Sequence, residues 1–295
     1  MNMKVDLCGV TLNNPVMTAS GTFGSGAEYA EFVDLNKLGA VVTKGVANVP
    51  WPGNPTPRVA EVYGGMLNAV GLQNPGIDLF VERDIPFLKQ FDTKIMVNVC
   101  GHSTEEYIEV VERLRDQPVD LLEINISCPN VKEGGIAFGQ DPKAVEAITK
   151  EMKKHAAQPV IMKLSPNVTD ITEMARAAEA GGADGLSLIN TITGMKIDIN
   201  RQKFVLANKT GGMSGPAIHP VAVRMVYQTA QAVSIPIVGM GGIMNAEDAI
   251  EMILAGATAV SVGTANFTNP HVTEEIVAGI RDYMERYQVS GWRSA

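Results

Sequence analysis

Short apolar runs of strand length recur along the chain, separated by stretches in which apolar residues follow helical spacing. After a hairpin over residues 5–12, eight such runs predict strands at Val16–Ser20, Ala40–Lys44, Lys94–Asn98, Leu121–Ile126, Val160–Leu164, Gly185–Ile189, Ile237–Gly239 and Ala259–Val262. Eight strands that alternate with helices predict an α/β fold, a (β/α)8 TIM barrel with an N-terminal hairpin. Because 295 residues suit one barrel with insertions, we expect a single domain over residues 1–295.

Residues with capping character mark where several helices begin and end. Capping-box spacing, a serine or aspartate followed three residues later by glutamate, starts at Ser103 and at Asp170. Asp141 precedes a proline, which is favoured at the first helical position. Glycine–alanine steps at residues 39–40, 182–183 and 256–257 predict tight turns from a helix into the next strand.

Two connections, residues 45–74 and 193–216, are too long to be plain loops. Both follow predicted strands and therefore lie at the C-terminal rim of the barrel, where active sites of this fold are found. The second contains two strand-like runs, Lys196–Ile199 and Phe204–Leu206. We expect these loop insertions to form lids or walls of a binding site.

Composition narrows the class of protein. Hydrophobic residues make up 45% of the chain, no apolar run approaches the roughly 18 residues that span a bilayer, and the N-terminus has no signal-peptide pattern. We therefore expect a cytoplasmic protein with no membrane partner. A net charge of −8 is unfavourable for binding nucleic acid. The cysteines Cys8, Cys100 and Cys128 form no C-x-x-C pair, which argues against a disulfide framework, a zinc site or an iron–sulfur cluster within the chain.

The last inward-facing residues of the predicted strands are amides, hydroxyls and lysines. They are Ser20, Lys44, Asn98, Asn125, Lys163, and Asn190 with Thr191. The set contains no histidine and no carboxylate, which counts against a metal site and against histidine-driven acid–base chemistry. Glu123 should face inward one layer below Asn125, as a structural carboxylate paired with a deep polar partner; Lys163 is one candidate partner.

Glycines follow the last two predicted strands, at Gly241–Gly242 and at Gly263–Thr264. In this fold, glycines at these places let backbone N–H groups approach a phosphate, although a glycine pair alone also suits a simple tight turn. The chain has no G-x-G-x-x-G after its first strand, so it lacks a dinucleotide-binding fold of its own. A ligand with one phosphate and a body that reaches Lys163, such as flavin mononucleotide (FMN), fits this pattern.

The stretch 121–130 is predicted to be a buried strand that ends in the thiol of Cys128, and a glycine-containing flap continues to Gly139. By itself such a cysteine is more often a structural residue than a catalytic one, since free cysteine is among the most buried residue types. The flap is expected to close over a substrate, or else to be an ordered surface loop.

These motifs resemble the class 1 dihydroorotate dehydrogenases, most closely the catalytic subunit of class 1B. The resemblance covers almost the whole chain and is carried by residues 16–21, 43–45, 68–76, 125–130, 241–242 and 263–264. It implies oxidation of dihydroorotate to orotate in pyrimidine biosynthesis, with FMN as the hydride acceptor. It also implies that Cys128 is the base that removes the C5 proton while the C6 hydride passes to the flavin.

The resemblance further implies two sets of binding residues. FMN would be held by Ser20, Gly21, Lys44, Gly45, Asn98, Asn125, Lys163, Ile189, Gly215, Gly241, Gly242, Gly263 and Thr264. Substrate would be held by Lys44, Asn68, Ala69, Val70, Gly71, Leu72, Asn125, Asn130, Asn190 and Thr191. Asparagine amides suit the imide edges of a pyrimidine dione, and Lys44 supplies a countercharge.

The chain carries no nicotinamide fingerprint, so electrons must leave the flavin through another molecule. In class 1B this is a partner subunit that carries FAD and a 2Fe–2S cluster and reduces NAD, in a heterotetramer built on a catalytic-subunit homodimer. Three alternatives stay open: a class 1A homodimer that uses fumarate, a related FMN- and cysteine-dependent dihydropyrimidine reductase, and a non-catalytic flavin carrier. The membrane-bound class 2 enzymes are disfavoured because they resemble this chain neither in the Cys128 base nor in its short N-terminus.

Overall fold

The computed structural model describes residues 2–127 and 136–289, and within them eight parallel strands close into a barrel. The strands are β3 (Val16–Thr18), β4 (Ala40–Val42), β7 (Lys94–Val99), β8 (Leu121–Asn125), β9 (Val160–Lys163), β10 (Gly185–Leu188), β15 (Ile237–Met240) and β16 (Ala259–Val262). They follow one another round the barrel in chain order. The predicted (β/α)8 barrel and all eight predicted strands are therefore confirmed.

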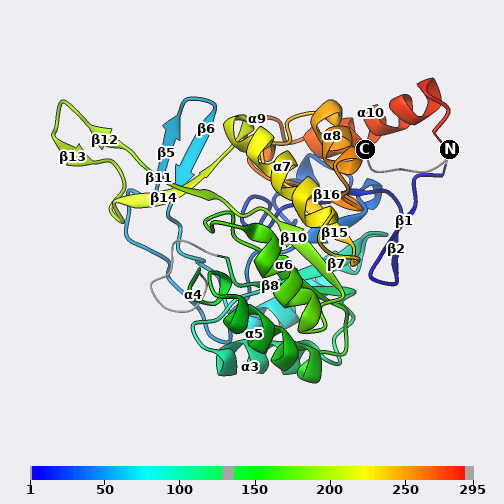
Figure 1. Cartoon of the computed structure of the whole chain (residues 1–295), viewed down its shortest axis with the longest axis horizontal. Coiled ribbons are helices and arrows are strands. Elements are labelled where there is room, and N and C mark those ends of the chain that lie inside the picture. Colours follow the sequence, from blue (N-terminus) through cyan, green and yellow to red (C-terminus); the bar gives the residue numbers. More distant parts are fainter. Residues whose placement is uncertain (1, 128–135, 290–295) are drawn as a thin grey trace.

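The longer helices pack around the outside of the barrel (Figure 1). They are α3 (Thr104–Leu114), α5 (Pro142–His155), α6 (Ile171–Ala180), α7 (His219–Ala230), α8 (Ala246–Leu254) and α10 (Val272–Arg286). Their apolar faces and the outward residues of the strands form one continuous core cluster. No helix in the described ranges is both long and apolar enough to span a membrane.

The predicted helix starts are present, with partners that differ in detail. Ser103 caps α3 by accepting from the Glu106 N–H at 3.4 Å, but the Glu106 carboxylate accepts from the His102 N–H instead of returning the bond to Ser103. Asp170 caps α6 through the Thr172 N–H at 2.9 Å, so the expected reciprocal pairing with a glutamate was wrong. Asp141 caps α5. The side chains reach the nearest free N–H groups of the first turn, whichever residue supplies them.

The strict alternation of strand and α-helix fails in the first crossover. After β3 the chain makes only two single-turn 3₁₀ helices, η1 (Tyr29–Glu31) and η2 (Leu35–Lys37). Gly21, Gly24 and Gly26 all have positive φ, which a right-handed helix cannot include. The next crossover is a mixed run, α1 (Ile77–Leu79), η3 (Phe80–Asp84) and α2 (Ile85–Leu88).

Of the three predicted glycine turns, two have the expected left-handed conformation. Gly182 and Gly256 have φ of +91° and +116°. Gly39 does not, and the prediction was wrong for it. Glycine is required at position 39 because a side chain has no room there: a Cβ would lie 2.1 Å from the carbonyl oxygen of Asn14.

The N-terminal hairpin, β1 (Val5–Leu7) paired with β2 (Val10–Leu12), closes one end of the barrel. Leu7 and Leu12 are fully buried against inward residues near the beginnings of the strands, among them Leu121 and Ile161. The hairpin lies at the opposite end of the molecule from the long insertions (Figure 1). This apolar plug leaves the C-terminal end of the barrel as the open end.

The two long insertions pair with each other at that open end. They supply β5 (Val59–Val62), β6 (Gly65–Asn68), β11 (Ile192–Met195) and β14 (Thr210–Ser214), which form an antiparallel sheet in the order β11-β14-β6-β5. The predicted strand-like runs form the small hairpin β12 (Ile197–Asp198) and β13 (Lys203–Phe204) beside it. The insertions thus form a β-sheet at the C-terminal rim, where they were expected to wall a binding site. The pairing of one insertion with the other was not predicted.

Candidate active site

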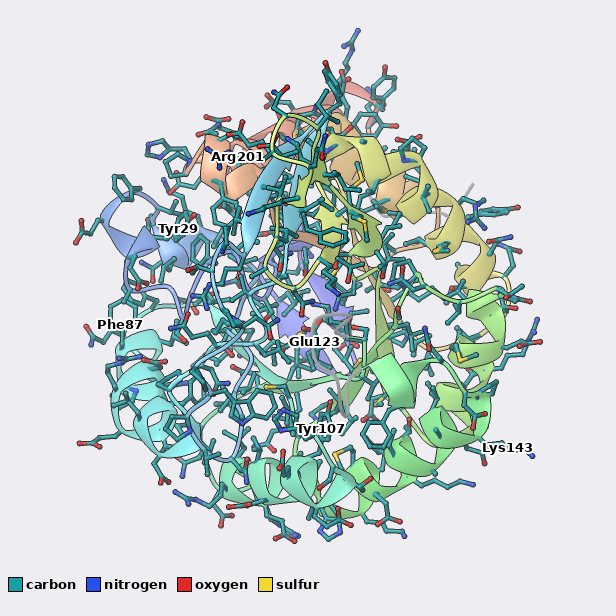
Figure 2. All side chains as sticks on the ribbon, turned by 90° about the vertical axis from the view of Figure 1, so that its left-hand side faces the viewer. Tyr29, Phe87, Tyr107, Glu123, Lys143 and Arg201 are labelled. Carbon is teal, nitrogen blue, oxygen red and sulfur yellow. The ribbon has the colours of Figure 1, made fainter. Side chains whose placement is uncertain are left out.

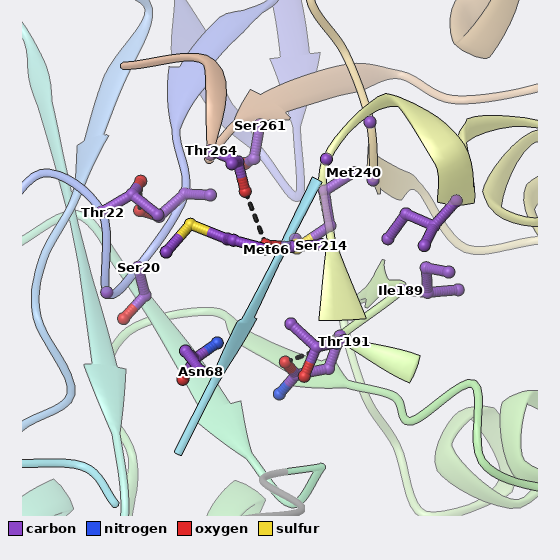
Figure 3. Close-up of a pocket in the computed structure, with 18 of the residues that line it drawn as sticks. Ser20, Thr22, Met66, Asn68, Ile189, Thr191, Ser214, Met240, Ser261 and Thr264 are labelled. Atoms are coloured by element: carbon purple, nitrogen blue, oxygen red, sulfur yellow. Dashed lines mark hydrogen bonds between the residues drawn. The ribbon is translucent and has the colours of Figure 1, made fainter. Parts of the chain in front are cut away.

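A pocket opens at the C-terminal ends of the barrel strands, below the antiparallel sheet (Figure 3). From the predicted cofactor set it is lined by Ser20, Gly21, Lys44, Asn125, Lys163, Ile189, Gly215, Gly241, Gly242, Gly263 and Thr264. From the predicted substrate set it is also lined by Asn68, Val70, Gly71, Leu72, Asn190 and Thr191. The fold therefore brings residues from both ends of the chain to one concave surface.

Three predicted residues lie behind this surface. Asn98 is fully buried and donates from Nδ2 to Glu123. Gly45 packs against Asn98, where a Cβ would lie 3.0 Å from the Asn98 Oδ1. Ala69 is buried in the small apolar cluster under the antiparallel sheet. Their contact with a ligand stays a prediction.

Two further predicted residues, Cys128 and Asn130, lie outside the described residues, as does the first part of the predicted flap, residues 131–135. The end of that flap is the short helix α4 (Ile136–Gly139), which was not expected. Gly139 meets the strand end closely, since a Cβ there would lie 2.3 Å from the carbonyl oxygen of Ile126. The backbone thus approaches the residues just before Cys128.

A polar layer fills the barrel directly beneath the pocket. Glu123 has no exposed surface, and it accepts hydrogen bonds from Asn98 Nδ2 at 2.5 Å and from Ser187 Oγ at 2.7 Å. The Nζ of Lys163 lies 3.5 Å from its Oε2. The expected structural pairing of Glu123 is confirmed, and Lys163 both pairs with it and lines the pocket.

The described lining contains two lysines, Lys44 and Lys163, and no carboxylate. Lys163 is 4% exposed, so its charge lies in a largely water-free region where electrostatic interactions are strong. Within the described ranges, no group of three or more histidine, cysteine, aspartate or glutamate residues could hold a metal ion. The site is built to bind an anionic or electron-rich organic ligand.

Glycines line the part of the pocket at the C-terminal ends of β15 and β16. Gly241 and Gly242 have φ of +126° and +71°, and a Cβ on Gly242 would lie 2.7 Å from the Cβ of His219. Gly263 and Thr264 immediately precede the short helix α9 (Ala265–Thr268). The conformation at the glycine pair is one that other residues rarely adopt, which agrees with the close backbone approach that a phosphate needs.

The sequence reasoning missed lining residues from the antiparallel sheet and several others, polar and apolar, beside the ends of the barrel strands. They are Ala19, Thr22, Val59, Met66, Ser214, Ile218, Met240, Ile243, Met244, Ser261, Ala265 and Phe267. Thr264 Oγ1 donates to Ser214 Oγ at 2.7 Å, which joins the barrel to β14 (Figure 3). The only signal for Ser214 was its position beside Gly215, because nothing in a single chain reveals which strands of two insertions will pair.

Comparison with known proteins agrees with this arrangement. The chain matches the family described as dihydroorotate dehydrogenase over residues 2–284. It is 72% identical to the protein named dihydroorotate dehydrogenase B (NAD(+)), catalytic subunit, of Lachnoclostridium phytofermentans, over 98% of this chain and 97% of that one. It is 66% identical to the protein of the same name from Alkaliphilus metalliredigens, over 98% and 96% of the two chains.

A solved structure of the Eimeria tenella enzyme DHODH, in complex with ferulenol, has the same fold. It superposes with a TM-score of 0.81 over 98% of this chain and 86% of that one, at 22% identity. That identity is low enough that this likeness concerns the fold alone. The match over residues 2–284 and the 72% identity go further, and by them the chain belongs to the dihydroorotate dehydrogenase family.

Proposed function

We propose that this chain oxidises dihydroorotate to orotate in pyrimidine biosynthesis, as the catalytic subunit of an NAD-linked dihydroorotate dehydrogenase. The observation that carries the proposal is the pocket at the barrel rim, where lysines, asparagine amides and glycine turns meet in a chain of this family. The relatives at 72% and 66% identity are both named as catalytic subunits of the B-type, NAD-linked enzyme. The cytoplasmic location expected from the sequence belongs to the same proposal.

The residues of the pocket fit FMN as its cofactor. Gly241 and Gly242 line the pocket with backbone alone, because a side chain on Gly242 would collide with His219, and such a glycine turn suits a phosphate. Lys163 offers a fixed positive charge for the electron-rich side of a flavin. When bound, FMN supplies the hydride acceptor.

The protein's own residues divide the remaining work. Lys44 supplies countercharge for a carboxylate, while Asn68, Asn125 and Asn190 offer amide groups to the ring edges of the substrate. Cys128 is the proposed base for the C5 proton, and Asn130 a further substrate contact. The proposal gives Cys128 this role because the described lining of the pocket contains neither histidine nor carboxylate to take the proton.

The electrons then leave through a partner subunit that carries FAD and a 2Fe–2S cluster, in a heterotetramer built on a dimer of this chain. The term catalytic subunit in the names of the relatives supports a separate electron-transfer subunit. The competing possibility is a class 1A homodimer that passes electrons to fumarate.

The proposal is tested by flavin reduction in the purified protein. The protein should copurify with FMN, and anaerobic dihydroorotate should bleach the flavin absorption. When the chain is coexpressed with the proteins encoded by neighbouring genes, the resulting complex should reduce NAD. A protein that takes up no FMN would contradict the whole proposal, and fumarate reduction by the isolated chain would contradict only its NAD-linked part.

The base is tested separately by Cys128→Ala, with Cys100→Ala as the control. Cys100 is fully buried beneath the rim in a cluster with Ala47 and Trp51. Cys128→Ala should keep FMN and slow its reduction by dihydroorotate by at least about a hundredfold, a typical contribution of a positioned base. Reduction at the wild-type rate would remove Cys128 from the mechanism.

A further inference from the structure

The buried carboxylate of Glu123 has no part in the reaction proposed above. It lies near the middle of the molecule when viewed from the side of the insertions (Figure 2), and it does not line the pocket. Asn98, Ser187 and Lys163 surround it with two hydrogen-bond donors and one positive charge. These neighbours provide the compensation that a buried carboxylate requires.

The carboxylate determines how the neighbouring amide is oriented. Because a carboxylate only accepts hydrogen bonds, Asn98 must turn its NH2 group toward Glu123 and its Oδ1 away from it. Asn125 Nδ2 donates to that Oδ1 at 3.3 Å. The orientation of the first amide therefore sets the orientation of the second, and the second lines the pocket.

The chain of hydrogen bonds continues from Asn125 through Ser127 to Asn190. Asn125 Oδ1 accepts from both the N–H and the Oγ of Ser127, at 3.3 and 3.0 Å, so both of its lone pairs are used. Ser127 Oγ in turn accepts from Asn190 Nδ2 at 2.8 Å. Among the described residues, Asn125 therefore has one N–H left to offer to a ligand and no free acceptor.

We propose that Glu123 is a positioning residue that sets the donor and acceptor directions of the substrate-facing amides through Asn98. The site would thereby select a ligand that presents a carbonyl oxygen, rather than an amino group, to Asn125. This inference rests on the proposed function, in which the ligand is a pyrimidine dione. In Glu123→Gln the new amide both donates and accepts, so Asn98 is free to reverse. A reversed Asn98 turns its NH2 group toward that of Asn125 and removes one constraint on the Asn125 amide, whose other constraint is the hydrogen bonding to Ser127.

The test compares orotate with its 2-amino and 4-amino analogues, in which one ring carbonyl oxygen is replaced by an amino group. Binding to the FMN-loaded protein is measured by titration calorimetry. The wild-type protein should prefer orotate by at least about a hundredfold over one of the analogues, because an amino group would face an N–H donor. Glu123→Gln should reduce that preference by about tenfold or more.

Two further variants separate positioning from simple support of the fold. Ser187→Ala removes one donor to Glu123 but leaves an acceptor-only carboxylate, so it should keep the preference for orotate. Ser127→Ala frees a lone pair of Asn125 without touching the buried charge pair, so it should lower the preference even where Glu123→Gln folds poorly.

The outcomes distinguish this inference from the proposed function. If Glu123→Gln and Ser127→Ala weaken all three ligands equally, the carboxylate is purely structural and the inference is overturned while the proposed function stands. If the wild-type protein binds no orotate, the proposed function fails and the inference fails with it.

Discussion

The Nδ1 of His219 lies 2.9 Å from the carbonyl oxygen of Gly241, in the turn that follows β15. The Nε2 of the same ring lies 3.0 Å from Glu251 Oε2 on α8. A carbonyl oxygen and a carboxylate are both acceptors, so both ring nitrogens of His219 face acceptors. This one side chain, at the start of α7, bonds the glycine turn to α8 and holds the proposed phosphate site in place.

Replacing His219 by leucine should weaken FMN binding by about tenfold, because the turn loses its only described side-chain bond to α7. Glu251→Gln is the matched control, since the glutamine oxygen still accepts from Nε2, and it should change FMN affinity less. Fluorescence titration of the apoprotein with FMN measures both. Unchanged affinity in His219→Leu would show that the glycine turn holds its shape without the ring.

Gly242→Ala should destabilise the protein and reduce FMN retention. The change adds left-handed strain at φ +71°, and its Cβ would lie 2.8 Å from the Gly215 carbonyl oxygen. Gly9→Ala is the control, because Gly9 has a similar φ of +82° with nothing within 4 Å of an added Cβ. We expect a loss of about 1 kcal/mol at Gly9 and about 3 kcal/mol or more at Gly242, measured by urea unfolding. Equal losses would mean that conformational strain, not crowding, makes glycine necessary there.

The thiol of Cys8 should resist alkylation in the native protein. Burial, with the nearby charges of Asp184 and Asp6, raises its pKa to about 12. The raised pKa means that at pH 8 only about one thiol in ten thousand is the reactive thiolate. Iodoacetamide followed by peptide mass spectrometry should find Cys8 unmodified in native protein and modified after denaturation. Rapid native labelling at this position would contradict the burial of its sulfur.

The Glu179 carboxylate should make one small, pH-dependent contribution to stability. Hydrogen bonds from the N–H and Oγ of Ser234, at 2.8 and 2.7 Å, hold its pKa below the usual 4.5. A lowered pKa gives stability that is present above pH 4.5 and is lost as the pH falls through the folded-state value. Glu179→Gln should therefore cost no more than about 1 kcal/mol at pH 7, since the bond is exposed, and the difference should shrink at pH 3. Urea unfolding of both proteins at the two pH values checks this, and a difference that grows in acid would contradict it.

Much of the barrel was predictable because its strands are buried on both faces. The run Leu121–Asn125 is buried at every position, so its apolar character identified it without any knowledge of its neighbours. The first crossover was not predictable in the same way, since glycines at 21, 24 and 26 break the helical pattern without saying what replaces it. The strands β5, β6, β11 and β14 are only partly buried. The pairs β5–β6 and β11–β14 join into one sheet through the pairing of β6 with β14, segments more than a hundred residues apart.

For the site, local chemistry located the strand-end residues but not their partners. Asn125 and Lys163 follow from strand alternation, a property of neighbouring residues, and both line the pocket. That Asn98 lies behind the pocket and bonds to Glu123 depends on the tilt and register of the closed barrel.

By itself, then, the sequence determined the barrel class, the open end of the barrel and the chemical character of the residues there, because each depends on the spacing of residues along one chain. Only the tertiary structure decided that the two insertions form one sheet over the pocket, that His219 contacts the Gly241 carbonyl, and that Glu123 accepts from Asn98. Those relationships join residues far apart in sequence, and their geometry exists only once the barrel has closed.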